Sequence, residues 1–373
     1  MSFSADDHRF MARAIELARK GRFTTSPNPN VGAVLVKCGQ IVGEGYHHQA
    51  GGPHAEVVAL QQAAEQAHGA DCYVTLEPCS HYGRTPPCAE ALIRAGVRRV
   101  VMAMQDPNPQ VAGRGVALLQ AAGIQVQSGL MAASARALNP GFLTLMEQQR
   151  PFVRLKLAAS LDGKTALNNG ASQWITSKEA RADVQLQRAQ SCAVLSTAET
   201  VLRDDARLSL RPEQALSPIS TLQDGHYRQP VRLVLDRRQR LTGNEALFAQ
   251  PGKLVLVYPE GCTQQAPAGA EILHAPCSQQ QFDLPALLQR LAQQHIHTLW
   301  VEAGARLAGS LLQASLVDEF WLYQAPKILG HQARGLVNLT ELTNVNDAIA
   351  LNWQDIRQLG PDLRFIATLH SRG

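Results

Sequence analysis

The sequence predicts two α/β domains that meet near residue 148. The chain of 373 residues is longer than one typical domain. Helical patterns alternate with strand patterns along it, which is typical of α/β folds. The alternation stops at the polar stretch 146–151 and then begins again. We therefore expect one α/β domain over residues 1–148 and a second over residues 149–373.

The first domain is expected to open with a helix over residues 6–21. Its apolar residues Phe10, Ile15 and Leu17 recur at helical spacing, and Gly21 can end it. A loop rich in Pro and Asn then leads into a β-hairpin that turns around residues 38–40. The remaining segments alternate, beginning with a helix: AEVVALQQAAEQA, CYVTLE, CAEALIRAG, RRVVMAMQ, GVALLQAAG and IQVQSGL. This alternation after an opening hairpin predicts a three-layer arrangement.

The second domain repeats the alternation with different segments. Its predicted strands are FVRLKLAASLDG, CAVLSTAETVL, PVRLVLDRR, KLVLVYP, HTLWVEAG and EFWLYQAPKIL. Its predicted helices include KEARADVQLQRAQ and ARLAGSLLQAS. Strands separated by helices again predict an α/β sheet.

Composition excludes several classes of partner. The net charge of +4 is spread along the chain and aromatic residues make up 5%, so a nucleic-acid surface is not expected. The sequence has no apolar run of about 18 residues and no signal-peptide pattern, so we expect no membrane partner. Seven irregularly spaced cysteines favour reduced thiols and a cytoplasmic location. A small anionic molecule remains compatible with this composition.

Four residues of the first domain predict a catalytic zinc site. His54 and Glu56 open a helix, Cys79 follows a strand, and Cys88 begins the next helix. One imidazole and two thiolates would leave the fourth position of a tetrahedral zinc ion open, as catalysis requires. Bound water would then ionise near pH 7, and Glu56 would carry its proton to a ring nitrogen and to departing ammonia.

This pattern matches a deaminase signature with one departure. The signature is H-x-E followed by P-C-x-x-C, whereas the two cysteines here are nine positions apart. The longer loop SHYGRTPP argues against a nucleoside or tRNA substrate and suggests that the loop itself recognises another one. The other cysteines have no partner at ligand spacing and are expected to be packing residues: Cys38, Cys72, Cys192, Cys262 and Cys277.

The second domain gives weaker signals of a cofactor. It lacks G-x-G-x-x-G, but the strand LWVEA runs into a helix start at 304–310, where backbone amides could approach a pyrophosphate. The alternative is a turn that serves only packing. Arg237, Arg238 and Arg240 could attract the 2′-phosphate of NADPH, or they could form a solvated basic turn.

Long segments of both halves resemble one known family. In the first half these are PNPNVGAVLV, GEGYH, GGPHAEVVAL, YVTLEPCSHYGRTPPC and MQDPNPQVAGRG. In the second half they are LKLAASLDGKTA, SQWIT, DVQLQRAQ, TVLRDD, LVLD, WVEAGARLAGSLL and APKILG. The chain is similar to the bifunctional deaminase/reductases of riboflavin biosynthesis, whose CSHxGRTPPC loop fits residues 79–88.

The resemblance implies a fold and a reaction for each half. The first domain would be a cytidine-deaminase-like three-layer α/β/α domain that uses Zn²⁺ to remove the 2-amino group of 2,5-diamino-6-ribosylamino-4(3H)-pyrimidinone 5′-phosphate. The second would be a dihydrofolate-reductase-like α/β domain that uses NADPH to reduce the ribosyl group to ribityl. The product would be 5-amino-6-ribitylamino-uracil 5′-phosphate.

The resemblance also implies roles for particular residues. His54, Cys79 and Cys88 would bind zinc, and Glu56 would shuttle protons. The substrate contacts of the deaminase would be Asn28, His47, Arg84, Asp106 and Asn108. The cofactor contacts of the reductase would be Ala158, Trp174, Thr200, Asp204, Arg237, Gly304, Ala305, Arg306, Leu307, Ala308, Gly309 and Ser310. Its substrate contacts would be Ser172, Arg188, Leu208, Arg211 and Glu302.

Three residues are candidates for assisting the reduction itself: Lys156, Asp204 and Glu302. The sequence does not rank them. Arg188 and Arg211 have the chemistry of a clamp for the 5′-phosphate.

Two other functions compete with this interpretation. The first is a monofunctional zinc deaminase, acting on cytidine or tRNA, with a non-catalytic second domain. The second is a regulatory protein whose inert deaminase-like domain senses a pyrimidine. The cysteine spacing and the segments SLDG and WVEAG count against the first, and the complete ligand set counts against the second. We also expect a homo-oligomer.

Overall fold

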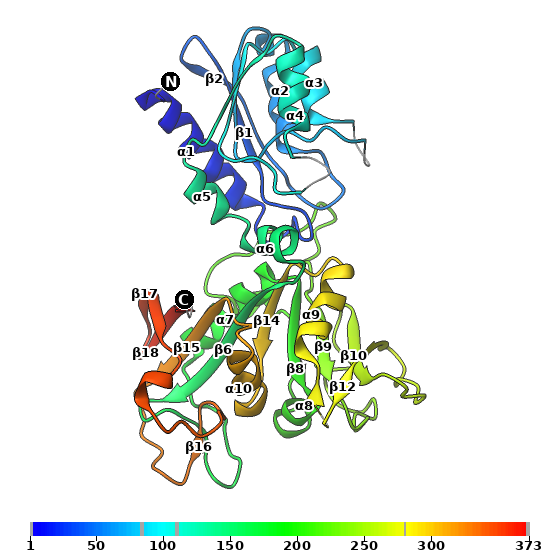
Figure 1. The fold of residues 1–373 in the computed structure, drawn as a ribbon, viewed down its shortest axis with the longest axis vertical. Coiled ribbons are helices and arrows are strands. Elements are labelled where there is room, and N and C mark those ends of the chain that lie inside the picture. Colours follow the sequence, from blue (N-terminus) through cyan, green and yellow to red (C-terminus); the bar gives the residue numbers. More distant parts are fainter. Residues whose placement is uncertain (1–2, 83–85, 109–111, 280, 371–373) are drawn as a thin grey trace. The chain divides into compact units, whose positions relative to one another are not determined.

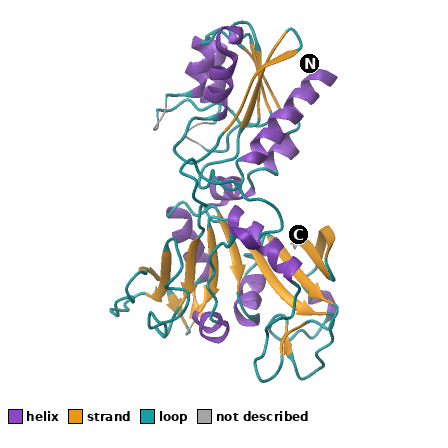
Figure 2. Ribbon diagram, turned by 180° about the vertical axis from the view of Figure 1, so that it is seen from behind, coloured by secondary structure: helices purple, strands orange, loops and turns teal. Residues whose placement is uncertain are grey.

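The computed structural model describes residues 3–82, 86–108, 112–279 and 281–370. The chain forms two compact units. Unit 1 comprises Met1–Gln149 and Ser220–Arg228, and unit 2 comprises Arg150–Ile219 and Gln229–Gly373. Both units combine helices with a β-sheet, so the predicted α/β fold class is confirmed in each (Figures 1 and 2).

The segment 220–228 belongs to unit 1 although the sequence analysis assigns it to the second domain. Two of its residues bind loops of unit 1. The backbone N–H of Gln223 donates to Gln49 Oε1 at 2.8 Å, and Arg228 Nε donates to the carbonyl oxygen of Phe23 at 3.1 Å. These hydrogen bonds attach residues 220–228 to unit 1, which the order of segments along the sequence does not reveal.

Unit 1 contains a five-stranded sheet in the order β2-β1-β3-β4-β5. Strand β1 is antiparallel to both β2 and β3, while β3, β4 and β5 are parallel. The strands are β1 (Gly32–Lys37), β2 (Gln40–Tyr46), β3 (Asp71–Val74), β4 (Arg99–Met102) and β5 (Gln125–Ser128). The hairpin β1–β2 turns at Cys38 and Gly39, as predicted.

Helices cover both faces of this sheet, which makes the three layers that the sequence predicts (Figure 1). One buried cluster joins α1, α5 and α6 to one face, and the other joins α2, α3 and α4 to the opposite face. The helices are α1 (Ala5–Lys20), α2 (Ala55–Ala63), 3₁₀-helix η1 (Ala64–Ala67), α3 (Cys88–Arg94), α4 (Arg114–Ala121), α5 (Ala132–Arg136) and α6 (Pro140–Gln148).

Unit 2 contains a nine-stranded sheet in the order β11-β10-β9-β8-β14-β6-β15-β18-β17. The strands from β11 to β15 are parallel, and the hairpin β17–β18 adds antiparallel to β15. The strands of this sheet are β6 (Phe152–Ser160), β8 (Ala193–Thr197), β9 (Val231–Leu235), β10 (Leu254–Pro259), β11 (Glu271–Ala275), β14 (Thr298–Glu302), β15 (Glu319–Ala325), β17 (Leu351–Leu359) and β18 (Asp362–Leu369). Two small two-stranded sheets pair β7 (Lys164–Ala166) with β16 (Arg334–Gly335) and β12 (Cys277–Ser278) with β13 (Gln281–Phe282).

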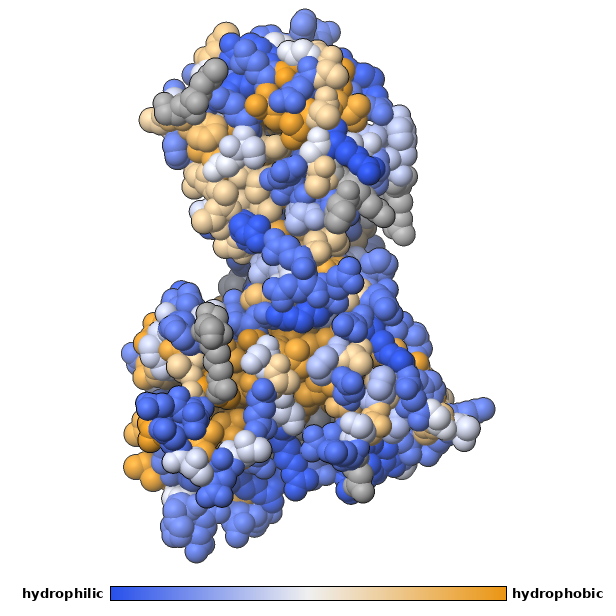
Figure 3. All heavy atoms as spheres, in the orientation of Figure 1, coloured by the Kyte–Doolittle hydropathy of each residue, from blue (hydrophilic) through white to orange (hydrophobic). Residues whose placement is uncertain are grey.

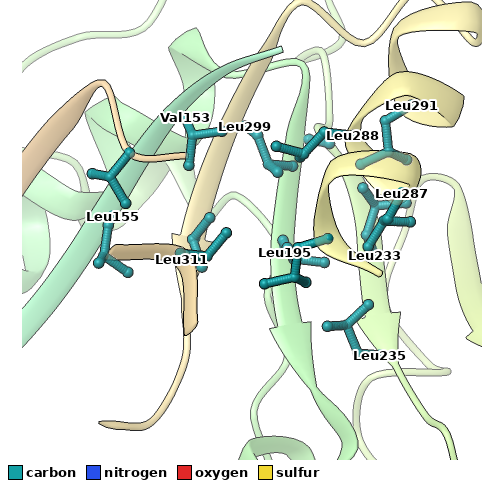
Figure 4. Close-up of a cluster of buried hydrophobic side chains, with 14 of the residues drawn as sticks. Val153, Leu155, Leu195, Leu233, Leu235, Leu287, Leu288, Leu291, Leu299 and Leu311 are labelled. Atoms are coloured by element: carbon teal, nitrogen blue, oxygen red, sulfur yellow. The ribbon is translucent and has the colours of Figure 1, made fainter. Parts of the chain in front are cut away.

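Helices also cover both faces of the sheet of unit 2. Apolar side chains of α9 and α10 pack on one face against strands β6, β8, β9 and β14 (Figure 4). Helices α7 and α8 pack on the other face. The helices are α7 (Lys178–Gln190), α8 (Ala198–Asp204), η2 (Pro212–Gln214), α9 (Leu284–Gln293), α10 (Ala305–Gln313) and η3 (Val345–Asp347). Because both faces are covered, the central parallel strands β8, β9, β10 and β14 are buried along most of their length.

One predicted strand is wrong in its second half. The segment CAVLSTAETVL contains strand β8 only as far as Thr197, and helix α8 begins at Ala198. The hydroxyl of Thr197 accepts the backbone N–H of Thr200, which is the N-cap bond that starts a helix. The helices α5 and α6 and the hairpin β17–β18 were not predicted either.

The surface view shows hydrophilic residues over much of the visible face of each unit, with smaller apolar areas between them (Figure 3). Among the helices that the structure describes, none combines the length and the apolar character needed to span a bilayer.

A buried ionic network ties α7 to the hairpin strands in unit 2. Asp183 accepts from the Tyr323 hydroxyl at 2.7 Å and from Arg364 at 3.0 and 3.2 Å. Arg364 also binds Asp355. Asp183 and Arg364 are 3% and 5% exposed, so neither charge can be satisfied by bulk water.

Asp183→Ala is therefore expected to destabilise unit 2 by about 3–5 kcal/mol, because the buried Arg364 loses its main anionic partner. Chemical denaturation followed by circular dichroism measures this loss. Lys253→Ala is the control, since Lys253 pairs with Glu271 at the surface with side chains that are 47% and 64% exposed, and an exposed pair contributes less than about 1 kcal/mol. Equal destabilisation by the two variants would refute the importance of the buried network.

Candidate functional site

Three side chains of unit 1 converge in a group suited to a metal ion. The ligand atoms of His54, Cys79 and Cys88 all lie within 4.8 Å of one another. His54 Nδ1 is 3.2 Å from Cys88 Sγ and 3.6 Å from Cys79 Sγ. These are the residues that the sequence analysis proposes as zinc ligands, and they come together from separate elements.

Helix starts bring these residues together. His54 is the extended N-cap of α2, and Cys88 is the first residue of α3, directly after Pro87. Cys79 lies in the loop after β3, and its Sγ accepts the backbone N–H of Cys88 at 3.3 Å. The hydrogen bonds from Cys88 and from His54 lower the pKa of Cys79 to about 4, although burial opposes the shift. A thiolate is the form in which cysteine binds metal.

Glu56 stands beside this group on the first turn of α2. It is 4% exposed, and burial, followed by the negative charge of Cys79, raises its pKa to about 7. A carboxyl group with a pKa near neutrality can both accept and donate a proton at physiological pH. Its position and its pKa suit the proton shuttle that the sequence analysis proposes.

Asn28 and His47 are linked beside the same group. His47 Nδ1 lies 3.0 Å from the carbonyl oxygen of Pro53, so this nitrogen carries the proton. His47 Nε2 then accepts from Asn28 Nδ2 at 3.0 Å. Because Asn28 Nδ2 donates to His47, the other amide atom, Oδ1, can accept a hydrogen bond from an N–H group of a ligand. The His47 ring also meets the His54 ring edge-on at 5.5 Å.

The other predicted deaminase contacts lie in two loops. Asp106 is 8% exposed, and burial raises its pKa to about 6. Its Oδ1 accepts the backbone N–H of Asn108 at 2.8 Å, which forms a local turn. Arg84, the predicted phosphate contact, falls outside the residues that the structure describes.

In unit 2, a buried ion pair joins two of the predicted reductase residues. Arg188 donates from Nε and Nη2 to the two oxygens of Glu302, at 2.7 and 2.9 Å. Trp300 Nε1 also donates to Glu302 at 3.0 Å. Burial would raise the pKa of Glu302, but the charge and hydrogen bonds of Arg188 outweigh it and lower the pKa to about 2. Glu302 is therefore a carboxylate at neutral pH.

Lys156 is the strand partner of Glu302. The two residues pair in register across the parallel strands β6 and β14. Burial lowers the pKa of Lys156, and the charge of Glu302 opposes that shift. Asp204 also acts on Lys156 through its charge, so all three candidates for assisting the reduction interact in one region.

A second arginine in this region carries an unused donor. Within the described residues, the buried Nε of Arg211 has no hydrogen-bond partner. Burial and the neighbouring charge of Arg188 lower the pKa of Arg211. Arg188 directs its remaining described bond to the carbonyl oxygen of Ser209 at 2.8 Å. Two close guanidinium groups, one with an unsatisfied N–H, suit an anionic ligand.

Sequence profiles of known families match both halves. The family described as the RibD C-terminal domain matches residues 151–365. The family described as the cytidine and deoxycytidylate deaminase zinc-binding region matches residues 4–104, which include His54, Glu56, Cys79 and Cys88. The second match supports a metal-binding role for the converging side chains.

Whole-chain relatives decide the family. The riboflavin biosynthesis protein RibD of Escherichia coli K12 is 53% identical over 96% of this chain and 98% of its own length. RibD of Haemophilus influenzae is 49% identical over 99% of each chain. The chain belongs to the RibD family.

Solved RibD structures share the fold. RibD of Acinetobacter baumannii superimposes with a TM-score of 0.91 at 44% identity, covering 98% of this chain and 99% of that one. A diaminohydroxyphosphoribosylaminopyrimidine deaminase/5-amino-6-(5-phosphoribosylamino)uracil reductase of Thermotoga maritima gives 0.85 at 34% identity, again over 98% and 99%. The predicted fold class is thus that of the RibD family in both halves.

In the region that matches the RibD C-terminal domain, helix α10 has a glycine, Gly304, as its N-cap. This N-cap residue has no side chain to cover the start of the helix. A Cβ at this position would meet no atom within 4 Å. Ala308 and Gly309 are buried, and a Cβ on Gly309 would lie 1.7 Å from the carbonyl oxygen of Asn338. The open space at Gly304 would let the first turn of α10 approach a phosphate, and the cofactor contacts of Ala308 and Gly309 stay predictions.

Other predicted contacts of the reductase lie on several elements. Ser172 donates to Asp204 Oδ1 at 3.1 Å, so these two predicted residues meet. Trp174 is 63% exposed and stacks under Arg181. Arg240 pairs with Glu199 of α8 at 2.9 Å. Ala158 lies on β6, Thr200 on α8, Leu208 in a buried turn and Arg237 just after β9. Their ligand contacts stay predictions.

The sequence analysis missed two residues that shape these sites. Trp300 holds Glu302 from the same strand, and its signal was its place two residues before Glu302 in WVE. Glu77 accepts four backbone N–H groups near Cys79. Glu77 lies in the loop after β3, directly before Pro78 and Cys79, and the sequence has no motif that marks it.

The low pKa of Glu302 predicts a pH effect on stability. A carboxyl group whose pKa falls from 4.5 to about 2 on folding stabilises the protein above pH 4.5, and this contribution is lost as the pH falls towards 2. We expect the difference in melting temperature between wild type and Glu302→Gln to be largest at neutral pH and to shrink over that window. Scanning calorimetry from pH 7 to 2 measures it. Glu341→Gln, at an exposed position, should show no such trend; a constant Glu302 difference would contradict the pairing.

Proposed function

We propose that the chain catalyses two consecutive steps of riboflavin synthesis. Water would replace the 2-amino group of 2,5-diamino-6-ribosylamino-4(3H)-pyrimidinone 5′-phosphate, and ammonia would leave. NADPH would then reduce the ribosyl group to ribityl, giving 5-amino-6-ribitylamino-uracil 5′-phosphate. The observation that carries the proposal is the convergence of His54, Cys79 and Cys88 beside Glu56 in a chain of the RibD family.

The donor set of unit 1 fits zinc. One imidazole and two thiols within 4.8 Å supply three ligands and leave a fourth position for a reacting group. Zinc, when bound there, would lower the pKa of a coordinated water to about 7. Glu56 would take up the proton of the attacking water and deliver it to the ring nitrogen and then to ammonia. Asn28, oriented by His47, would accept a hydrogen bond from the pyrimidine.

The residues of unit 2 fit an anionic sugar and a nicotinamide cofactor. NADPH, when bound, would supply the hydride. The amides that begin α10 at Gly304 would meet its pyrophosphate. Arg211, with its unsatisfied Nε, and Arg188 would attract the 5′-phosphate of the sugar. Lys156, close to Glu302 and Asp204, would orient the sugar carbonyl or donate the accompanying proton.

A coupled assay tests both steps at once. The purified protein is given the diamino-pyrimidine phosphate and NADPH, and ammonia release is followed together with absorbance at the NADPH band. We expect ammonia first and NADPH oxidation after it. NADPH oxidation should begin without a lag when the deaminated compound is supplied.

Each alternative function predicts a different outcome. Ammonia release with no NADPH oxidation, even from the deaminated compound, would favour a monofunctional deaminase. Binding of the pyrimidine without release of ammonia would favour a sensor. A metal-free preparation that deaminates at full rate would refute the zinc mechanism.

Two further properties belong to the same proposal. We infer that the protein works in the cytoplasm on a small molecule, because its substrate class is a soluble metabolite and no disulfide joins the described cysteines. We also infer a homo-oligomer, which light scattering coupled to size-exclusion chromatography tests. A mass of one chain, 40.5 kDa, would refute the second inference.

A further inference from the structure

A single carboxylate, that of Glu77, accepts hydrogen bonds from four backbone N–H groups, and it lies two residues before the predicted zinc ligand Cys79. Glu77 Oε2 accepts the N–H of Asp106 at 3.2 Å and of Gly113 at 3.1 Å. Its Oε1 accepts the N–H of Gly115 at 3.1 Å and of Val116 at 3.3 Å. The side chain is 3% exposed, so these amides replace the water that a carboxylate would otherwise bind.

The four amides belong to two structures, the turn at Asp106 and the start of α4. Asp106 begins the turn that contains Asn108. Gly113, Gly115 and Val116 form the N-cap and the first turn of α4, whose amides have no partner inside the helix. The Glu77 carboxylate therefore caps the N-terminus of α4, although it lies far from α4 in the sequence. One of its oxygens also accepts the backbone N–H of Asp106.

The loop after β3 that carries Glu77 also carries a predicted zinc ligand. Pro78 and Cys79 follow Glu77 directly, and the Glu77 backbone N–H donates to the carbonyl oxygen of Met104 at 3.0 Å. Helix α4 approaches so closely that a Cβ on Gly115 would lie 2.1 Å from the carbonyl oxygen of Pro78. Glycine is thus required there, and the contact leaves the loop little room to shift.

We propose that Glu77 is a positioning residue of the deaminase: it fixes the Asp106–Asn108 turn relative to the metal ligands, and it contacts neither metal nor substrate itself. The proposal rests on the proposed deaminase function, because Asp106 and Asn108 are its expected pyrimidine or ribose contacts. It adds that their distance from the metal group is set by one buried side chain. Loss of that side chain should impair substrate binding before it impairs zinc binding.

Glu77→Gln is the sharpest variant. The amide keeps the shape and one acceptor oxygen, but its NH₂ group faces two N–H donors, which then lose their acceptor. We expect KM for deamination to rise about tenfold or more, kcat to change less, and zinc content to stay at the wild-type level. Glu77→Asp keeps the charge but is one methylene shorter, so it should restore only part of the loss. Glu147→Gln, at an exposed position of α6, should behave as wild type.

Hydrogen exchange gives a readout that needs no activity. In Glu77→Gln, the amides of Asp106, Gly113, Gly115 and Val116 should exchange at least about tenfold faster than in wild type, while amides of β1 and β3 keep their protection. Reduction of the deaminated compound by the same preparation should be unchanged. It reports that unit 2 is intact.

The outcomes separate the two proposals. If the wild-type protein releases no ammonia, the proposed function fails, yet the exchange experiment still tests the placement of the loop. If the wild type is active and Glu77→Gln keeps its KM and its exchange rates, the positioning role is refuted. Loss of zinc in proportion to activity would also overturn it, because Glu77 would then support the ligands rather than the substrate loop.

Discussion

Glu56→Gln is expected to lower the rate of ammonia release by about 10²–10⁴-fold, which is the usual contribution of a positioned acid–base group. Glutamine matches glutamate in shape but cannot accept and return a proton. Glu56 is buried on the first turn of α2, beside the metal donors, with a pKa raised to about 7 by burial. The substitution therefore removes the proton shuttle and leaves the three ligands in place. Ammonia release measured at saturating substrate gives the effect.

Two controls make this result specific. Glu65→Gln lies in the exposed 3₁₀ turn that follows the same helix, and it should keep full activity. In Glu56→Gln itself, metal analysis should find about one zinc per chain, and NADPH oxidation should persist with the deaminated compound. Normal deamination by Glu56→Gln would show that another group moves the proton. Loss of zinc would show that Glu56 supports the ligands instead.

The fold was predictable where local pattern and long-range contact agree. Helix α1 follows from Phe10, Ile15 and Leu17 at helical spacing and from Gly21 at its end, and the hairpin β1–β2 follows from its turn at Gly39. The second half of CAVLSTAETVL was not predictable in this way, because β-branched residues favour a strand while the Thr197 cap starts a helix. The assignment of residues 220–228 to unit 1 depends on Gln223 and Arg228, whose partners are distant in the sequence.

The candidate sites divide along the same line. His54, Glu56, Cys79 and Cys88 could be found because zinc chemistry demands a few residue types at helix starts and strand ends. Glu77 could not, since a carboxylate that binds only backbone amides has no motif of its own. For Arg188, the predicted role as a phosphate clamp stays a prediction, and its pairing with Glu302 could not be read from the sequence. The types of residue in a sequence indicate which reactions a site can support, but the ion-pair partner of each charged side chain depends on tertiary contacts.

Cys88→Ala is expected to abolish zinc binding and, with it, deamination. Only His54 and Cys79 would remain, and two protein ligands are fewer than the three that hold a catalytic zinc ion. Zinc content should fall from about one ion per chain towards zero, and ammonia release should fall below detection. Metal analysis of the purified protein and the ammonia assay measure the two effects. Reduction of the deaminated compound should continue, because that chemistry uses residues of unit 2.

Cys72→Ala is the matched control for this experiment. Cys72 and Cys88 are both fully buried in unit 1, and each substitution removes one buried thiol group. Burial raises the pKa of the Cys72 thiol well above its usual value, so Cys72 is a neutral packing thiol, and it is not among the described residues that converge on the candidate metal site. Its variant should keep zinc and activity at the cost of about 1 kcal/mol of stability, because a small cavity is left. If the two variants lose zinc equally, general disruption of the core explains the loss, and Cys88 is not a ligand.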